Sequence, residues 1–166
     1  SYNLLCNPLN NTAANGNAST NLFSLAAGAQ QPTSQILTWD VNTFDFDVAQ
    51  PSFGASSWDS SVQLPVGKGF FYVNNGAKFT NTFVGEVIQG SFTNAIVGLG
   101  SYNCVGSSVP SAGSFTNAIA GLVPAPTDQV LTWDIPNFDF KAVQPPFGAS
   151  SWDTTALNVS VGEGLF

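Results

Sequence analysis

The sequence predicts an all-β protein built of two related units, each a sandwich-like or barrel-like set of short antiparallel strands. Three observations carry this prediction. Apolar and polar residues alternate in short runs rich in Val, Ile, Thr and Phe, which is typical of half-buried strands. Gly, Pro, Asn and Asp separate these runs, as turns require. Helical periodicity is almost absent, and one long segment recurs.

The recurring segment indicates an internal duplication. ILTWDVNTFDFDVAQPSFGASSWDSS at 36–61 returns as VLTWDIPNFDFKAVQPPFGASSWDTT at 130–155, at a constant offset and without a gap. All five aromatic residues of this segment recur at matching positions. We therefore expect one unit at 1–88 and a second, related unit at 89–166.

The elements of the first unit follow from local pattern. Two short segments, 19–29 and 114–122, are the helix candidates, of one or two turns each. The Asn-Gly signal within 74–78 predicts a turn, so 69–87 is expected to form a hairpin. The expected strands are QILTWD at 35–40, TFDFDVA at 43–49, SVQLPV at 61–66, GKGFFYVN at 67–74 and AKFTNTFVGEV at 77–87.

The second unit ends differently from the first. VGEGLF at 161–166 matches VGKGFF at 66–71, after which the first unit still has its expected hairpin. An open sheet edge at this place would leave backbone groups and apolar side chains uncovered. Three explanations stay open: the chain continues, a strand such as the amino-terminal one fills the gap, or a neighbouring subunit supplies a strand.

Composition excludes several classes of partner. Charged residues make up 8 % of the chain, with three basic residues against ten acids, so no basic surface exists for nucleic acid. No apolar run is long enough to span a membrane. The low-charge, polar composition suggests an extracellular or cell-surface protein, in which case Ser1 would follow a removed signal peptide.

The sequence contains few residues that could carry out catalysis. The chain has no His and no Arg, so His-dependent hydrolase mechanisms are impossible and no enzyme is expected. Carboxylates such as Asp40 and Asp59, which recur in the second unit, are expected to accept backbone hydrogen bonds in turns. No cofactor is expected. Calcium at Asp45 and Asp47 is an alternative, weakened because Lys141 replaces the second aspartate in the repeat.

Two cysteines and three sequons are further candidate sites. Cys6 and Cys104 follow matching Tyr residues on the same predicted strand face, which makes a disulfide reasonable. Two buried free thiols are the alternative. Asn10, Asn17 and Asn158 lie in N-x-[ST] sequons and are candidate N-glycosylation sites.

Some motifs resemble a family of secreted bacterial β-rich repeat proteins. They are YNLLCNPLNN at 2–11, PVGKGFFYVNNGAKFTNTFVGEV at 65–87 and QGSFTN at 89–94, similar to the GxNLIxNPL, VGEGFF and FVGEVPQG motifs of that family. The resemblance covers nearly the whole chain. It implies two related β-rich halves, a second hairpin after the second VGEGFF motif, no catalytic residues, and association with the cell surface and extracellular fibrils.

These observations predict a structural subunit of an extracellular filament or surface layer, assembled head-to-tail with copies of itself by β-strand sharing. The expected donor strand holds Tyr2, Leu4 and Leu5. The expected acceptor edge holds Val161, Leu165 and Phe166. The alternative is a carbohydrate-binding module of a secreted protein that binds glycans through exposed Trp58 and Trp152.

Overall fold

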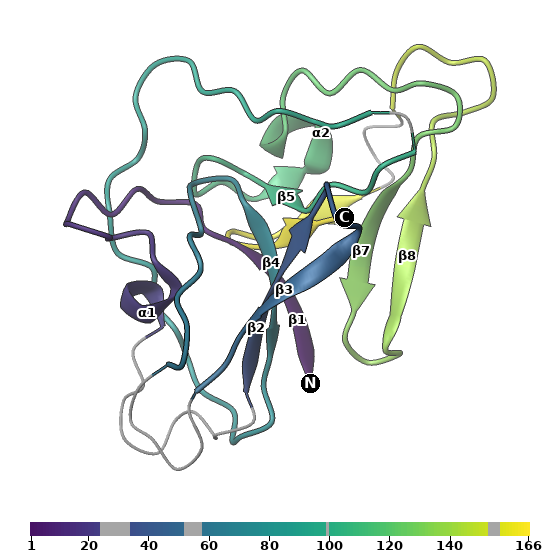
Figure 1. Ribbon diagram of the computed structural model, residues 1–166. Coiled ribbons are helices and arrows are strands. Elements are labelled where there is room, and N and C mark those ends of the chain that lie inside the picture. The colour runs from purple at the N-terminus through teal and green to yellow at the C-terminus, as the bar shows by residue number, and fades with distance from the viewer. Residues whose placement is uncertain (24–33, 52–57, 99, 153–156) are drawn as a thin grey trace.

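The computed structural model describes residues 1–23, 34–51, 58–98, 100–152 and 157–166. It is all-β, with antiparallel sheets and two one-turn helices, as the sequence predicts (Figure 1). In chain order the elements are β1 (Tyr2–Cys6), α1 (Ser19–Leu22), β2 (Gln35–Asp40), β3 (Asp45–Ala49), β4 (Gly69–Val73), β5 (Val105–Gly106), β6 (Gly113–Ser114), α2 (Phe115–Ala118), β7 (Val130–Asp134), β8 (Asp139–Val143), β9 (Asn158–Val159) and β10 (Gly164–Leu165).

The largest sheet has four strands in the order β1-β4-β2-β3. Its strand β4 is apolar throughout and buried along its whole length, as expected for a strand covered on both faces. β1 pairs with β4 from Tyr2 opposite Val73 to Cys6 opposite Gly69. β2 pairs with the other edge of β4, and this pairing ends at Leu37 opposite Phe71. The amino-terminal strand is therefore an integral part of the main sheet.

The β2–β3 and β7–β8 hairpins have the same register. Each places a Trp directly opposite a Phe, in the pairs Trp39↔Phe46 and Trp133↔Phe140. The last loop residue, Phe44 or Phe138, has a positive φ of 56° or 52° and an exposed ring. This left-handed conformation costs a non-glycine residue about 1–2 kcal/mol. Both hairpins carry this strained aromatic turn at matching positions of the sequence repeat.

The carboxy-terminal residues repeat the pairing of β4. In β10, Leu165 lies opposite Val105 of β5. Phe166 then exchanges two backbone hydrogen bonds with Leu131 of β7, at 2.8 and 2.9 Å. The matching residues of the first unit, Phe71 and Leu37, lie opposite each other in the main sheet. The pairing of the second unit thus follows that of the first as far as Phe166.

Four strands, β1, β4, β5 and β10, close into what we call the four-strand ring. β1 meets β10 where the Cys6 backbone N–H donates to the carbonyl of Gly162 at 2.8 Å. β4 meets β5 where the Gly106 N–H donates to the carbonyl of Gly67 at 3.0 Å. Both contacts cross the boundary expected between 1–88 and 89–166. Continuous backbone hydrogen bonding therefore joins these two segments (Figure 1).

Two glycines make the four-strand ring sterically possible. A Cβ atom on Gly106 would overlap the Cβ and Sγ atoms of Cys6. A Cβ atom on Gly69 would lie 2.7 Å from the Sγ atom of Cys104, closer than side chains approach one another. Each cysteine side chain therefore occupies the space that a side chain on the facing glycine would need.

An aromatic cluster packs between the two hairpins. Phe71 contacts Trp133 and Phe140 of the β7–β8 hairpin, with ring centroids 5.9 and 6.2 Å apart. Phe166 contacts Trp39 and Phe46 of the β2–β3 hairpin at 5.5 and 6.3 Å. Such pairs contribute about 0.5–1.5 kcal/mol beyond the area that they bury. Each unit therefore places its central Phe on the hairpin of the other unit.

Two further cores lie on either side of the ring, one in each unit. The first core is rich in aromatic residues, the second less so. The first contains Leu22, Phe23, Ile36, Ala49, Leu64, Phe70 and Tyr72, with Trp58, Phe79 and Phe83 among the residues packed against it. The second contains Phe115, Val130, Trp152, Val159 and Leu165, with Val105, Ile119 and Leu122 packed against it.

Two local predictions were wrong. The expected hairpin at 69–87 is absent, because 74–87 forms no strand and Phe79 and Phe83 pack onto the first core instead. The expected strand at 61–66 is reduced to one bridge at Gln63, next to a proline-containing segment. The two helices span four residues each, within the expected one or two turns, and part of the candidate at 19–29 lies outside the described residues.

No helix in the described part of the chain is long and apolar enough to cross a membrane.

The close packing of the four-strand ring predicts that a larger residue at Gly106 destabilises the protein. We expect Gly106→Ala to lower the free energy of unfolding by about 1–3 kcal/mol, because the new methyl group overpacks against Cys6. Denaturant unfolding of the purified protein measures this loss.

Two controls separate the contact from a general effect of alanine. Gly98→Ala should change stability by less than about 0.5 kcal/mol, since a Cβ there meets no atom within 4 Å. Cys6→Gly combined with Gly106→Ala should recover part of the loss. Additive losses in the double variant would contradict the steric explanation.

Candidate functional site

The expected donor residues lie within the molecule's own sheet. Tyr2, Leu4 and Leu5 belong to β1, and all three are paired with β4. Leu4 is buried, whereas Tyr2 is 43 % exposed and packs its ring against Trp133 at 5.9 Å. β1 is therefore not a free strand, and its removal would take one edge from β4.

The expected acceptor residues lie at the junction of β10 with its neighbours. Leu165 is buried and paired with β5, and Phe166 is bonded to Leu131 of β7. Val161 is exposed beside the ring. Because Leu5 also bridges Glu163, the expected donor and acceptor segments lie side by side in one chain.

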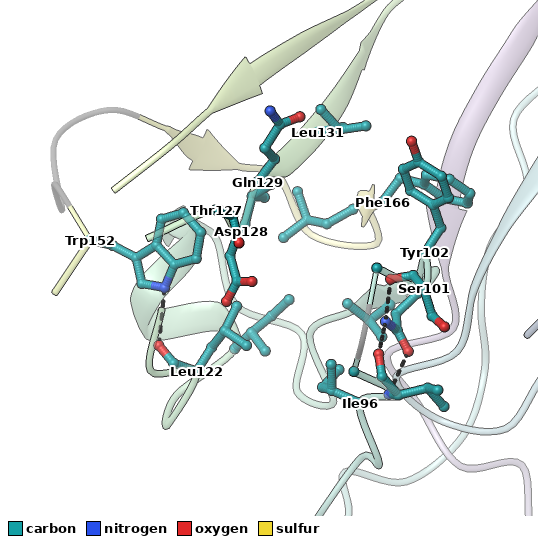
Figure 2. Close-up of a pocket in the computed structure, with 18 residues that line it drawn as sticks. Ile96, Ser101, Tyr102, Leu122, Thr127, Asp128, Gln129, Leu131, Trp152 and Phe166 are labelled. Carbon is teal, nitrogen blue, oxygen red and sulfur yellow. Dashed lines mark hydrogen bonds between the residues drawn. The ribbon is translucent and has the colours of Figure 1, made fainter. Parts of the chain in front are cut away.

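A cavity of about 460 Å³, which we call the slot, lies beyond Phe166 in the second unit. Figure 2 shows Trp152 and Leu122 on one side of it and Tyr102, Phe166 and Ile96 on the other. Most of its inner wall is apolar. Several apolar lining residues also belong to the second core or pack against it. They are Val105, Ile119, Leu122, Val130, Leu165 and Trp152.

The first unit fills the matching place with its own chain. There β4 continues past Phe71, so Tyr72 lies opposite Ile36 and Val73 opposite Gln35. In the sequence repeat, Val130 and Gln129 match Ile36 and Gln35, and both line the slot. The slot therefore lies where the first unit has the last two residues of β4.

The walls of the slot match the surroundings of Tyr72. Tyr72 stacks on Phe23, the residue that ends α1, with centroids 5.1 Å apart. Ile119 ends α2 in the same way and lines the slot. Phe79 adds a ring contact to Tyr72 at 5.5 Å, and Phe83 one to Phe23 at 5.7 Å. Three aromatic side chains of the first unit thus lie at the place that matches the slot, and they also line a second cavity of about 930 Å³.

The connecting segment before β5 borders the slot. The Asn103 side chain accepts a hydrogen bond from the Val97 N–H and donates one to the Val97 carbonyl, both at 2.9 Å. Its counterpart Asn3 donates to the Tyr72 carbonyl at 3.2 Å. Val97 therefore takes up part of the hydrogen bonding that Tyr72 supplies in the first unit, while its side chain stays 41 % exposed.

One carboxylate lies at the polar rim of the slot. Asp128 is exposed, and its Oδ2 atom accepts a hydrogen bond from the Ala125 N–H at 2.7 Å. The other ionisable residue of the lining is Tyr102, whose ring stacks on Phe166 at 5.3 Å. The slot thus combines an apolar wall with one negative charge at its rim.

The carboxylates of the repeated aspartates accept hydrogen bonds in turns. The Asp40 carboxylate accepts hydrogen bonds from the backbone and side chain of Asn42, and the backbone bond is the main reason that its pKa is lowered. Hydrogen bonds from Lys141 and Asn137 lower the pKa of Asp134, which lies 2.6 Å from the Lys141 ammonium. Such bonds are the role in turns expected from the sequence.

No group of three or more His, Cys, Asp or Glu side chains suited to a metal occurs in the described ranges. The two tryptophans considered for carbohydrate binding are packed against the cores. Trp152 is 7 % exposed and donates to the Leu122 carbonyl at 3.1 Å. Trp58 is half-buried and donates to the Phe23 carbonyl at 2.9 Å. Their indoles therefore do not form open stacking platforms.

The three sequon asparagines differ in accessibility. The Asn17 amide donates to Asn10 and accepts from Asn7 and the Asn11 backbone, so it is held in a side-chain network. Asn10 is also bridged to Glu86 through its backbone. Asn158 is exposed in β9. Of the three, Asn158 presents its side chain most openly for glycosylation.

Comparison of the chain with protein-family models, with curated proteins and with solved structures found no match. The argument for a function therefore uses the geometry of the slot and the residues around it.

Most slot residues carry no chemical signature that sequence reasoning could detect. They are small apolar or polar residues from the connecting segment, α2 and β7. The usable signal was the repeat itself, since aligning the two units shows which neighbours of Tyr72 have counterparts in the slot lining.

Cys6 and Cys104, the candidate disulfide pair, are buried free thiols in the structure. Burial raises the pKa of each to about 12. We therefore expect Ellman's reagent at pH 8 to find no reactive thiol in the native protein, because the reactive thiolate is almost absent.

In guanidinium chloride without reductant the same assay should find both thiols, and one in Cys104→Ser. No thiol in the unfolded wild-type protein would instead indicate a disulfide.

Proposed function

We propose that this protein is a structural subunit of an extracellular filament or surface layer, in which copies join head-to-tail by sharing β-strands. The single observation that carries the proposal is the slot. It is a cavity beside β7 whose lining includes residues of the second core.

The chemistry of the slot suits an extended peptide. In strand addition, main-chain hydrogen bonds supply affinity and side-chain pockets supply specificity. The β7 residues before Leu131 face the slot beside an apolar wall, so an added strand could continue the pairing of Phe166 and bury side chains against the second core. A small rigid ligand would use the wall but not the strand edge.

Composition supports association outside the cell. Charged residues are few, so most of the surface is uncharged and polar, although the formal net charge of −7 opposes close packing of copies. Exposed apolar side chains also border the slot: Ile96 is 45 % and Val97 is 41 % exposed. The exposed sequon at Asn158 is compatible with a glycan-bearing surface.

We favour a donor segment other than β1. Withdrawing β1 would unpair β4 and expose buried Leu4 and Cys6. A segment that already lies on the surface avoids this cost.

The proposal is tested by blocking the slot. Gly98 lines the slot, is exposed, and has open space around its missing Cβ. We expect wild-type protein to form filaments in negative-stain electron microscopy, and Gly98→Trp to raise the concentration needed for assembly by roughly tenfold or more, because the indole occupies the slot.

Gly98→Ser is the matched control and should assemble like the wild type. Monomeric wild-type protein at all concentrations, or filaments unchanged by Gly98→Trp, would contradict the proposal. Circular dichroism of all three proteins checks that folding is unaffected.

A further inference from the structure

We infer that Asp45 and Asp139 close the two outer sheet edges of the molecule to β-pairing with other chains. These outer edges are the side of β3 that faces away from β2 and the side of β8 that faces away from β7. The inference depends neither on the proposed function nor on the slot.

β3 and β8 are edge strands. β3 is the last strand of the four-stranded sheet, and β8 is paired with β7 alone. Among the described residues neither strand has a second strand partner. β4 and Phe166 pair with the inner strands, β2 and β7, and so do not reach these edges. Both strands are largely exposed, and Figure 1 shows β8 at one margin of the molecule. Such an edge carries unpaired backbone groups on which another chain can pair.

In β8 the N–H of Phe140 belongs to the outer edge. Opposed residues of an antiparallel pair alternate between those that exchange backbone hydrogen bonds and those that do not. Phe166 takes both backbone bonds of Leu131, so the Leu131↔Ala142 pair exchanges none. The Trp133↔Phe140 pair lies two residues further along and is of the same type. The Phe140 N–H therefore points away from β7.

In β3 the N–H of Phe46 has the same position. Phe46 lies opposite Trp39 in the register that Phe140 has in the second hairpin. The Trp39 carbonyl accepts a hydrogen bond from the Lys68 ammonium at 3.3 Å, from outside the hairpin. Two residues after Phe46, the Val48 carbonyl accepts one from the Ser60 hydroxyl at 3.5 Å, also from outside the hairpin. These bonds agree with an outward-facing Phe46 N–H.

An aspartate side chain caps this N–H on each edge. The Phe46 N–H donates to the Asp45 Oδ1 atom, and the Phe140 N–H donates to the Asp139 Oδ1 atom, both at 2.7 Å. Hydrogen bonds to an ionised acceptor are roughly twice as strong as those between neutral groups. An incoming strand would have to displace the carboxylate and place its own carbonyl oxygen beside a negative charge. Pairing along either outer edge is therefore unfavourable where the cap lies.

The cap is common to both edges, whereas acidity in general is not. Asp45 and Asp139 occupy matching positions of the sequence repeat and make the same bond. Asp47, two residues after Asp45, is exposed and accepts no hydrogen bond from the described residues. Its counterpart in the repeat is Lys141. The two units thus share the acid that caps the edge and differ at the acid that does not.

Removal of both caps tests the inference. We expect Asp45→Ala combined with Asp139→Ala to aggregate at roughly one-tenth of the protein concentration that the wild type requires, because the freed N–H groups can pair with another chain. Each single alanine variant should give a smaller shift of the same sign. Light scattering and thioflavin T fluorescence measure the threshold, and circular dichroism checks the fold. Asp45→Asn combined with Asp139→Asn keeps an acceptor oxygen at each cap and should stay close to the wild type.

Two controls separate edge pairing from loss of charge and from unfolding. Asp47→Ala removes a carboxylate from β3 without freeing an N–H, so its threshold should equal that of the wild type. Val48→Pro and Ala142→Pro, added to the double alanine variant, remove the other outward N–H groups and should restore the wild-type threshold. An unchanged threshold in the alanine variants, a lowered one that the prolines do not restore, or an equal shift in Asp47→Ala would each overturn the inference.

Discussion

At the four-strand ring, Gly69 and Gly106 let strands from the two halves of the chain approach so closely that each glycine faces a cysteine side chain. This close approach determines the rest of the arrangement. It sets β10 against β1 and β5 against β4, which in turn brings Phe71 and Phe166 onto the opposite hairpins. A larger side chain at either glycine would separate the strands and with them the aromatic cluster.

Strands with a strong local pattern were predictable, whereas those that depend on distant partners were not. The Trp-Asp and Phe-Asp-Phe pattern predicts the two strands of the first hairpin, and the sequence repeat carries the same pattern to the second. At 69–87 the turn signal and the side-chain packing conflict. The Gly76 N–H does donate to the Asn74 side chain, as a turn would require, yet both edges of β4 are already paired with β1 and β2, and Phe79 and Phe83 pack onto the first core. Side-chain packing overrides the turn signal.

The candidate site was predictable in kind but not in detail. Matching VGEGLF to VGKGFF places Phe166 at the position of Phe71, and Phe166 does pair with Leu131 as Phe71 pairs with Leu37 and lines the slot. The role of β1 could not be read from the sequence, because a strand at the amino terminus has the same pattern whether it pairs within the chain or outside it. Its partners, β4 and β10, lie far along the chain, and no local pattern encodes that choice.

The two cores differ in the size of their side chains, and this difference bears on the proposed sharing of strands. In the first core the ring of Phe23 contacts both Phe70 and Tyr72. The positions of the second core that match Phe23 and Phe70 hold Ile119 and Leu165, which are smaller. Apolar side chains that line a cavity lose the packing contacts of a filled core. An added strand would restore those contacts, so association and completion of the second core would draw on the same burial of apolar surface.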